Sequence, residues 1–188
     1  MEILTRTELK LRFNEILEKI SAGAIFIYPT DTIYGIGCNA LNKKSVEKIR
    51  QLKERPDSPL SVWVPSKEWI KENCEVTKDL KEKLAQLPGS VTLVLKLKNK
   101  KAVADNVNLN LKTIGIRIPD HWFHEIIQEL NLPIITTSAN KAGQPFMTSI
   151  EDLDPDIQEG IEFMIYEGPK EGKPSKIVNL VEGKVIKR

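Results

Sequence analysis

Cationic and hydroxyl side chains recur in this sequence where predicted strands and helices end. Lys53 and Arg55 stand two residues apart at the carboxyl end of a predicted helix. Arg117 lies inside an apolar strand, so its side chain must reach solvent, an acidic partner or a ligand cleft. Because open sheets bind ligands at strand ends, such groups predict a local site for an anion. The groups of this kind are Thr30, Thr32, Lys53, Arg55, Thr113, Arg117, Thr136, Thr137, Ser138 and Asn140.

Each of these groups also has a simpler structural explanation. Basic residues in a last helical turn compensate the helix dipole by ~0.3–1 kcal/mol, which by itself would account for Lys53 and Arg55. Residues 136–140 (TTSAN) could form an ordinary cap or turn, although their hydroxyls and amide equally suit a base, a ribose or a phosphate oxygen. The apolar setting of Arg117 favours the ligand-binding interpretation, because a charge there needs a partner.

Two glycine-rich segments imitate phosphate-binding motifs without meeting their spacing. Residues 35–40 (GIGCNA) match the G-x-G-x-x-A form of a dinucleotide fingerprint, but a six-residue gap separates them from the preceding strand. Residues 168–174 (GPKEGKP) have three residues between the glycines instead of four, and Pro174 stands where a P-loop has Ser or Thr. The sequence also lacks H-E-x-x-H and G-x-S-x-G, so metal-dependent and serine hydrolysis have no support.

Apolar periodicity predicts the elements that position these groups. The predicted helices run from a capping box at Thr5 and Glu8 to Gly23, from a cap at Ser45, through pieces within 66–86, and from Asp120. The predicted strands cover residues 24–28, 60–64, 91–97, 114–118, 134–137, 163–166, 177–180 and 184–186, and a loop covers 29–37. Because strands and helices interleave without an internal boundary, we expect a single α/β (α+β) domain over residues 1–188 with a mixed, largely buried sheet.

Composition excludes several classes of protein. With 28 Lys plus Arg against 26 Asp plus Glu, the net charge is only +2, and 40% of the residues are hydrophobic. These values are typical of a folding chain and exclude a disordered one, and a nucleic-acid coat would carry a strong basic excess. Cys38 and Cys74 have no metal-ligand spacing with either histidine. Without an export signal or an apolar span, we expect a soluble, reduced, cytoplasmic protein that does not enter membranes.

Charge is patterned even though its sum is small. Residues 151–167 hold seven acids and no base, whereas residues 170–188 hold six bases and two acids. The two segments are either solvated faces or, in a more specific interpretation, an acidic stretch followed by a basic tail that closes over an anion.

Five ordered segments and two near the end resemble one known family. The five are YPTDTIYGIG (28–37), KERP (53–56), PGSVT (88–92), IGIRIPDH (114–121) and TSAN (137–140), and the two are GKPSKIV (172–178) and KVIKR (184–188). Together they are similar to the YrdC-like family, the threonylcarbamoyl-AMP synthases, in its single-domain form. The resemblance implies a twisted mixed sheet with flanking helices around a large open cleft.

The resemblance also implies an activity. Family members are nucleotidyltransferases that combine L-threonine, bicarbonate and ATP into L-threonylcarbamoyladenylate and release pyrophosphate. A threonylcarbamoyl transferase complex then uses this product to modify an adenosine of tRNA. Magnesium would arrive with the ATP phosphates, because no carboxylate cage can be recognised in the sequence. Direct binding of tRNA or another structured RNA is a further expectation.

Roles for individual residues follow from the same resemblance. Lys53 and Arg55 would be catalytic, because they would bind the ATP phosphates on which charge builds. The other residues fall into two groups, according to the ligand that each would bind. ATP would also be bound by Thr113, Thr136, Ser138, Asn140 and Arg188, and L-threonine by Thr30, Arg117 and Ser175.

Two alternatives remain open at this point. An RNA-binding module without catalysis would use the basic segment and the cleft, although the near-neutral total charge argues against this as the sole function. A carbamoyl-adenylate-forming domain would start from carbamoyl phosphate and would not need threonine.

Overall fold

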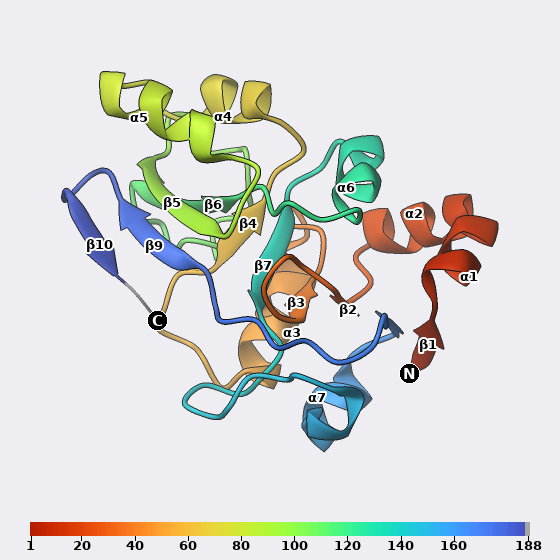
Figure 1. Cartoon of the computed structure of the whole chain (residues 1–188). Helices are drawn as coiled ribbons and strands as arrows, with labels where there is room; N and C mark the ends of the chain where they lie inside the picture. Colours follow the sequence, from red (N-terminus) through yellow and green to blue (C-terminus); the bar gives the residue numbers. More distant parts are fainter. Residues whose placement is uncertain (187–188) are drawn as a thin grey trace.

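A ten-stranded mixed sheet forms the centre of the computed structural model, which describes residues 1–186 (Figure 1). The strand order is β1-β8-β2-β3-β7-β4-β6-β5-β9-β10, with parallel and antiparallel pairs intermixed. The strands are β1 (Glu2–Leu4), β2 (Phe26–Tyr28), β3 (Gly35–Gly37), β4 (Ser61–Trp63), β5 (Val91–Lys96), β6 (Thr113–Arg117), β7 (Ile134–Ser138), β8 (Phe163–Ile165), β9 (Lys176–Asn179) and β10 (Lys184–Ile186). The predicted mixed α/β class is confirmed.

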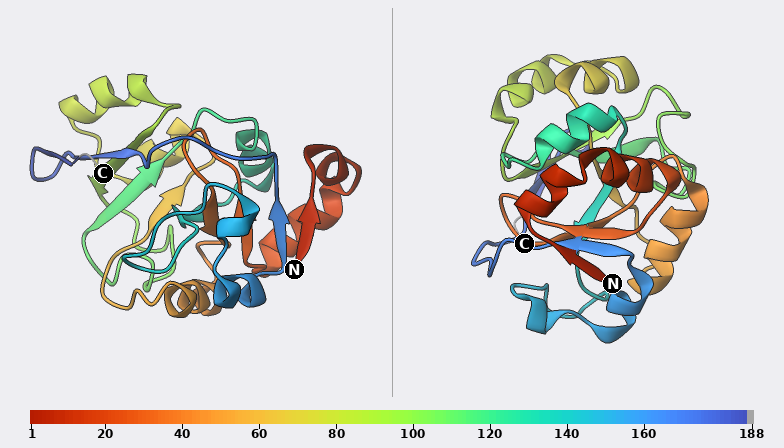
Figure 2. Two further views of the ribbon diagram at one scale, coloured as in Figure 1. Left: turned by 60° about the horizontal axis from the view of Figure 1, so that its bottom comes forward. Right: turned by 90° about the vertical axis from the view of Figure 1, so that its right-hand side faces the viewer.

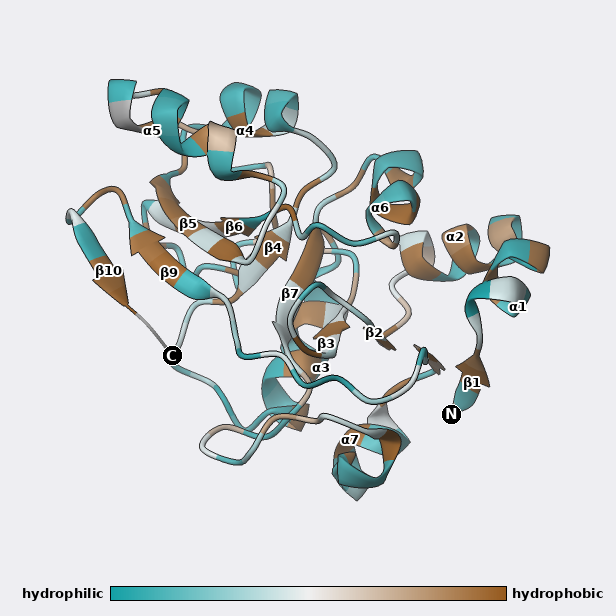
Figure 3. Ribbon diagram, viewed as in Figure 1, coloured by the Kyte–Doolittle hydropathy of each residue, from teal (hydrophilic) through white to brown (hydrophobic). Residues whose placement is uncertain are grey.

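Helices cover both faces of this sheet. They are α1 (Arg6–Leu11), α2 (Phe13–Ala22), α3 (Lys43–Leu52), α4 (Lys67–Asn73), α5 (Lys78–Lys83), α6 (His124–Leu130) and α7 (Pro155–Gly160), with 3-10 turns η1 (Leu84–Gln86) and η2 (Ile150–Asp152). Their outer sides are hydrophilic and the strands they cover are mostly hydrophobic (Figure 3). Within the described chain, no helix has the length and apolar character needed to cross a bilayer.

Side-chain alternation along the strands builds one hydrophobic core on each face. Ile27 and Ile135 belong to the larger core, which α3, α4, α5 and α7 cover. Their neighbours Tyr28 and Ile134 belong to the second core, an aromatic cluster beneath α1, α2 and α6. The second core occupies only part of its face. The rest of that face, toward the ends of β6 and β7, carries polar residues and forms the site described below.

Several element boundaries differ from the prediction. The Thr5–Glu8 capping box is present, but the first predicted helix is two helices that meet at Arg12. Asn42 caps α3 instead of Ser45, because its side-chain oxygen accepts from the Ser45 N–H. Asp120 does not open α6, which begins at His124.

The segment predicted to be a loop over 29–37 contains a strand, β3. A Cβ at Gly35 would lie 3.1 Å from the Tyr28 ring, and one at Gly37 would lie 2.3 Å from the Ile135 carbonyl oxygen. The tyrosine ring therefore covers both glycines, and its hydroxyl donates to the Ile135 carbonyl at 2.8 Å. These glycines allow the close packing of neighbouring strands. The GxGxxA spacing therefore has a structural reason here, and it does not lead directly into a nucleotide-binding helix as in the dinucleotide motif. Strand β1 was also missed.

A connection that we call the strap, residues 166–175, joins β8 near one edge of the sheet to β9 near the other. It contains no helix or strand and runs across the molecule in front of β3 and β7 (Figures 1 and 2). Seven strand intervals separate β8 from β9, about 34 Å in a flat sheet, while the steps from Ile165 to Lys176 span at most about 36–40 Å.

Candidate functional site

Residues from six separate segments line an open pocket on the polar part of the sheet, and its empty space, open solvent included, is about 560 Å³. The walls come from the β2–β3 loop, the α3–β4 loop, the ends of β5, β6 and β7, and the end of the strap. Six of the ten residues with predicted roles line it, namely Thr30, Arg55, Arg117, Thr136, Ser138 and Ser175, and so does Thr137 from the wider set of polar groups.

Thr30 organises the loop between β2 and β3. Its buried hydroxyl oxygen accepts from the backbone N–H groups of Thr32 and Ile33, at 3.1 and 3.2 Å, and donates to the Ile33 carbonyl at 2.6 Å. This pattern is that of a Thr-based turn, which fixes the loop without a glycine. The loop therefore presents Thr30 to the pocket in a single conformation.

Arg117 is 93% buried at the end of β6 and lines the pocket. Its Nη2 atom lies 2.9 Å from Oδ1 of Asp31, in an ion pair whose two side chains are each 9% exposed. The other carboxylate oxygen of Asp31 accepts from the Ser90 hydroxyl and the Asp120 N–H. The Arg117 side chain thus reaches two of the three expected surroundings, an acidic partner and a cleft. Asp31 was not predicted as a site residue, although its place in the loop beside Thr30 was visible in the sequence.

The loop that carries Arg55 is held by another arginine, which the sequence did not single out. Arg50, buried in the last turn of α3, donates to five backbone carbonyls, three of them in residues 55–58 and two in residues 106–107. Burial lowers the pKa of this guanidinium. Arg50 thereby fixes the path of the loop, and Arg55 reaches the pocket wall with Nη2 3.5 Å from the Pro59 carbonyl.

Lys53 lies behind the pocket and is 2% exposed. Its ammonium donates to the backbone carbonyls of Ser138 and Asn140, the second at 2.6 Å. Asn140 does not line the pocket; its amide nitrogen donates to the carbonyl of Gln144, which closes a turn after β7. These contacts give both residues a role in shaping the loop around Ser138, and their roles toward ATP stay predictions.

The predictions for Thr113 and Arg188 remain to be compared with the structure. Thr113 begins β6 and shares a sheet face with Arg117, but it stands at the opposite end of the strand and outside the pocket. Arg188, predicted to bind phosphate, lies outside the described residues. Ser175, the last residue of the strap, lines the pocket, and its hydroxyl lies 2.8 Å from that of Thr92 on β5; its role toward L-threonine stays a prediction.

Several lining residues were missed, among them Tyr34, Ser61, Thr92 and Pro174. Thr92 lies within PGSVT (88–92), a segment that carries the family resemblance. It is a polar residue directly before an apolar one in a predicted strand, and this was the signal that could have identified it. Ser61 faces Gly115 on the neighbouring strand, where a Cβ would lie 2.4 Å from the serine hydroxyl. A side chain at Gly115 would therefore collide with Ser61, a residue of the pocket lining.

The chemical character of the pocket follows from its lining. Among residues 1–186, its charged lining residues are Arg55 and Arg117, accompanied by threonine and serine hydroxyls, and none of these lining residues is a carboxylate. In the described part of the chain, His, Cys, Asp and Glu form no group of three that could hold a metal ion. Cys38 and Cys74 are both free and buried. The arrangement suits ligands that carry negative charge and hydroxyl or amine groups.

Comparisons with known proteins agree with this architecture. A family model for Sua5, YciO and YrdC, described as "Telomere recombination", matches residues 18–188. A Methanocaldococcus jannaschii protein provisionally named threonylcarbamoyl-AMP synthase is 37% identical, over 97% of this chain and 87% of its own length. A Bacillus subtilis threonylcarbamoyl-AMP synthase is 36% identical over 77% of this chain, but over only 43% of its own length.

A solved structure gives the same assignment. The crystal structure of P. abyssi Sua5 complexed with L-threonine has a TM-score of 0.84 and 29% identity, and the match covers 98% of this chain and 55% of that one. The chain thus spans most of the first relative and about half of the second relative and of this structure. With a family model that covers residues 18–188, the chain belongs to the Sua5/YciO/YrdC family, and the resemblance seen in its sequence motifs is confirmed.

Proposed function

We propose that this protein is a threonylcarbamoyl-AMP synthase, which forms L-threonylcarbamoyladenylate and pyrophosphate from L-threonine, bicarbonate and ATP. The observation that supports this most directly is the lining of the pocket, in which Arg55 and Arg117 lie among threonine and serine hydroxyls. It lies in a fold that also occurs in a protein solved with L-threonine. The relatives that cover most of this chain carry the same enzyme name.

The chemistry requires two anions to be held side by side. Threonine and bicarbonate condense, with loss of water, to a carbamate; a carbamate oxygen then attacks the α-phosphorus of ATP, and pyrophosphate leaves. The protein supplies no nucleophile in this scheme. Its task is to orient the carbamate and ATP and to stabilise the negative charge on the phosphoryl oxygens, for which cations and hydroxyls are suited.

The geometry divides these tasks between two sides of the pocket. Arg117 and Ser175 lie at the strand ends next to the Thr30 loop, and we assign them and Thr30 to L-threonine. Arg55, Thr136 and Ser138 come from the α3–β4 loop and β7, and we assign them to ATP, with Lys53 and Asn140 as supports of the Ser138 loop.

Magnesium enters this scheme as part of the MgATP substrate, since the pocket lining offers cations and no carboxylates. The product is a reactive mixed anhydride, so we further propose that a threonylcarbamoyl transferase takes it over and modifies tRNA in the cytoplasm.

The test is pyrophosphate release by purified protein with ATP and magnesium. We expect release to require both L-threonine and bicarbonate, and the product to have the mass of threonylcarbamoyladenylate. Arg55→Ala should lose at least ~10-fold in kcat/KM, the usual loss for one charge-assisted hydrogen bond, while Lys44→Ala, which removes an exposed lysine from the preceding helix α3, should not.

Release that is independent of threonine but requires carbamoyl phosphate would instead identify a carbamoyl-adenylate-forming domain. Absence of ATP turnover together with RNA binding that persists at ~0.2 M salt would identify an RNA-binding module.

A further inference from the structure

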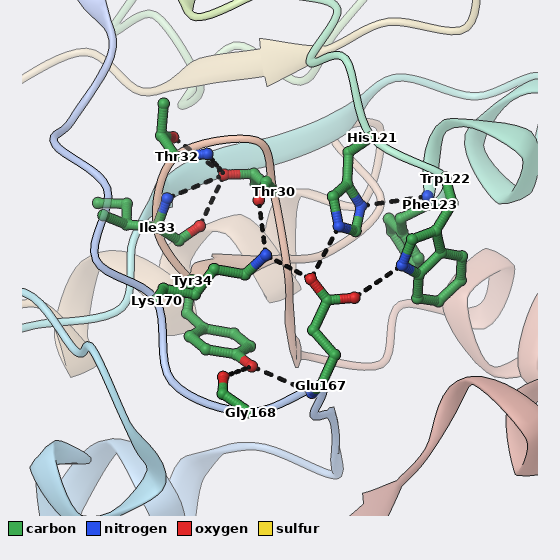
Figure 4. A network of polar contacts seen from close by, with 10 residues as sticks. All are labelled: Thr30, Thr32, Ile33, Tyr34, His121, Trp122, Phe123, Glu167, Gly168 and Lys170. Atoms are coloured by element: carbon green, nitrogen blue, oxygen red, sulfur yellow. Dashed lines mark hydrogen bonds and ion pairs between the residues drawn. The ribbon is translucent and has the colours of Figure 1, made fainter.

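The strap is fastened to the loop that carries Thr30 by a network of polar contacts (Figure 4). At its centre is Glu167, whose carboxylate accepts from His121 Nε2 at 3.0 Å, from Trp122 Nε1 at 2.7 Å and from Lys170 Nζ. Partial burial opposes ionisation, but the hydrogen bonds from Lys170, Trp122 and His121 prevail and lower the pKa of Glu167 to about 2. Glu167 is therefore an anion at neutral pH.

Lys170 connects this carboxylate to the pocket. Its ammonium lies between Glu167 and the backbone carbonyl of Thr30, to which it donates at 3.0 Å (Figure 4). The side chain is only 16% exposed, and Nζ lies 5.9 Å from the centre of the Tyr34 ring. Lys170 itself does not line the pocket. Its contact is with the backbone carbonyl of Thr30, the residue that we assign to L-threonine.

A second set of contacts holds the same two segments together. The Tyr34 hydroxyl donates to the Gly168 carbonyl at 2.6 Å and accepts from the Glu167 N–H at 3.1 Å. The first residues of the strap are thus fixed to the far end of the loop. Lys170 remains the contact that reaches the Thr30 carbonyl, and the Thr30 hydroxyl organises the rest of the loop.

We infer that Lys170, held by Glu167, is a positioning residue for the amino-acid substrate. It fixes the Thr30 loop in the position in which Thr30 and Arg117 bind L-threonine together. This inference rests on the proposed function and assigns a role that the pocket lining does not show. Because the ATP side of the pocket is built from β7 and the α3–β4 loop, Lys170 affects the threonine side selectively.

The test compares Michaelis constants in the pyrophosphate-release assay with the full chain. Lys170→Met should raise KM for L-threonine about tenfold, the usual loss for one charge-assisted hydrogen bond, with less than a twofold change in KM for ATP. Lys173→Ala is the matched control, since it removes an exposed lysine from the same strap and should change neither constant. Direct titration with L-threonine should show the same loss of affinity.

Glu167→Gln provides a second, milder variant that keeps the shape of the side chain. It should raise KM for threonine in the same direction, and the double variant should be no worse than Lys170→Met alone, because the two residues act through one contact. If both KM values rise equally, or if only the melting temperature changes, Lys170 has a purely structural role and the inference is wrong. A wild-type protein without threonine-dependent release refutes the proposed function, whereas an active wild type with an unchanged KM in Lys170→Met refutes this inference alone.

Discussion

Gly172 is the position where one added methyl group should disturb the site most and the fold least. A Cβ there would lie 1.8 Å from the Thr32 carbonyl oxygen and 2.7 Å from its carbonyl carbon, both backbone atoms that no side-chain rotation can move. Restoring normal van der Waals separation requires the strap and the β2–β3 loop to separate by roughly 1.5 Å. Misplacement of catalytic geometry by ~1 Å commonly costs about 10²-fold in rate, so Gly172→Ala should lose about 100-fold in kcat/KM for threonine.

The stability of Gly172→Ala should change much less than its activity, because no strap residue is a buried member of either core and only Tyr166, at the start of the strap, packs against one. The control is Gly168→Ala in the same strap, where a Cβ would meet nothing within 4 Å but the backbone has φ of +98°. That variant has only the conformational cost of a left-handed residue, ~1 kcal/mol, and should keep most activity. Steady-state kinetics and thermal unfolding of both variants decide the matter. Near-wild-type kcat/KM in Gly172→Ala, or an equal loss in Gly168→Ala, would refute the steric reasoning.

Three further predictions concern single side chains. Arg117→Lys should raise KM for threonine at least ~10-fold, because a lysine cannot reproduce the planar guanidinium that faces both Asp31 and the pocket; kinetics at saturating ATP measure this. Lys53→Met should lower the free energy of unfolding by about 1–3 kcal/mol, since it leaves the carbonyls of Ser138 and Asn140 without their donor, and urea titration checks the loss. Burial lowers the pKa of His124 below its ordinary 6.5, so the unfolded chain binds the extra proton more tightly and stability falls as the pH drops through ~6.5. Urea titrations at pH 7.5 and 5.5 should show that loss, and His124→Gln should show less of it.

Most elements could be predicted from the sequence, several three-residue strands among them, but β1 and β3 could not. The run at 91–97 closely matches β5, and the run at 184–186 matches β10. β3 was taken for a loop because two of its three residues are glycines, which usually break strands. They are needed there because the Tyr28 ring lies over them, a contact that depends on which strands are neighbours. β1 is three residues long and pairs with β8, far away in the sequence, so local pattern offered no signal.

The site could be predicted where a residue type was unusual for its local setting. Arg117 stood out because an apolar strand is an expensive place for a charge, and the structure supplies Asp31 as its partner. Arg50 did not stand out, because an arginine in a helix is unremarkable until the loop folds back over it. For the same reason the Glu167–Lys170 pair looked like two surface charges, since its function depends on where a connection without regular structure lies.

The strap also has a consequence for the order in which the molecule is completed. The pocket wall formed by Ser175 exists only after β9 has paired with β5, and the hydroxyl contact that joins them spans 83 residues of sequence. Pairings between such distant segments form late in folding, because the chain must first give up the entropy of a long loop. A chain that stops before β9 would have the helices and most of the sheet but would lack the wall that Ser175 supplies, so the complete pocket depends on one long-range pairing.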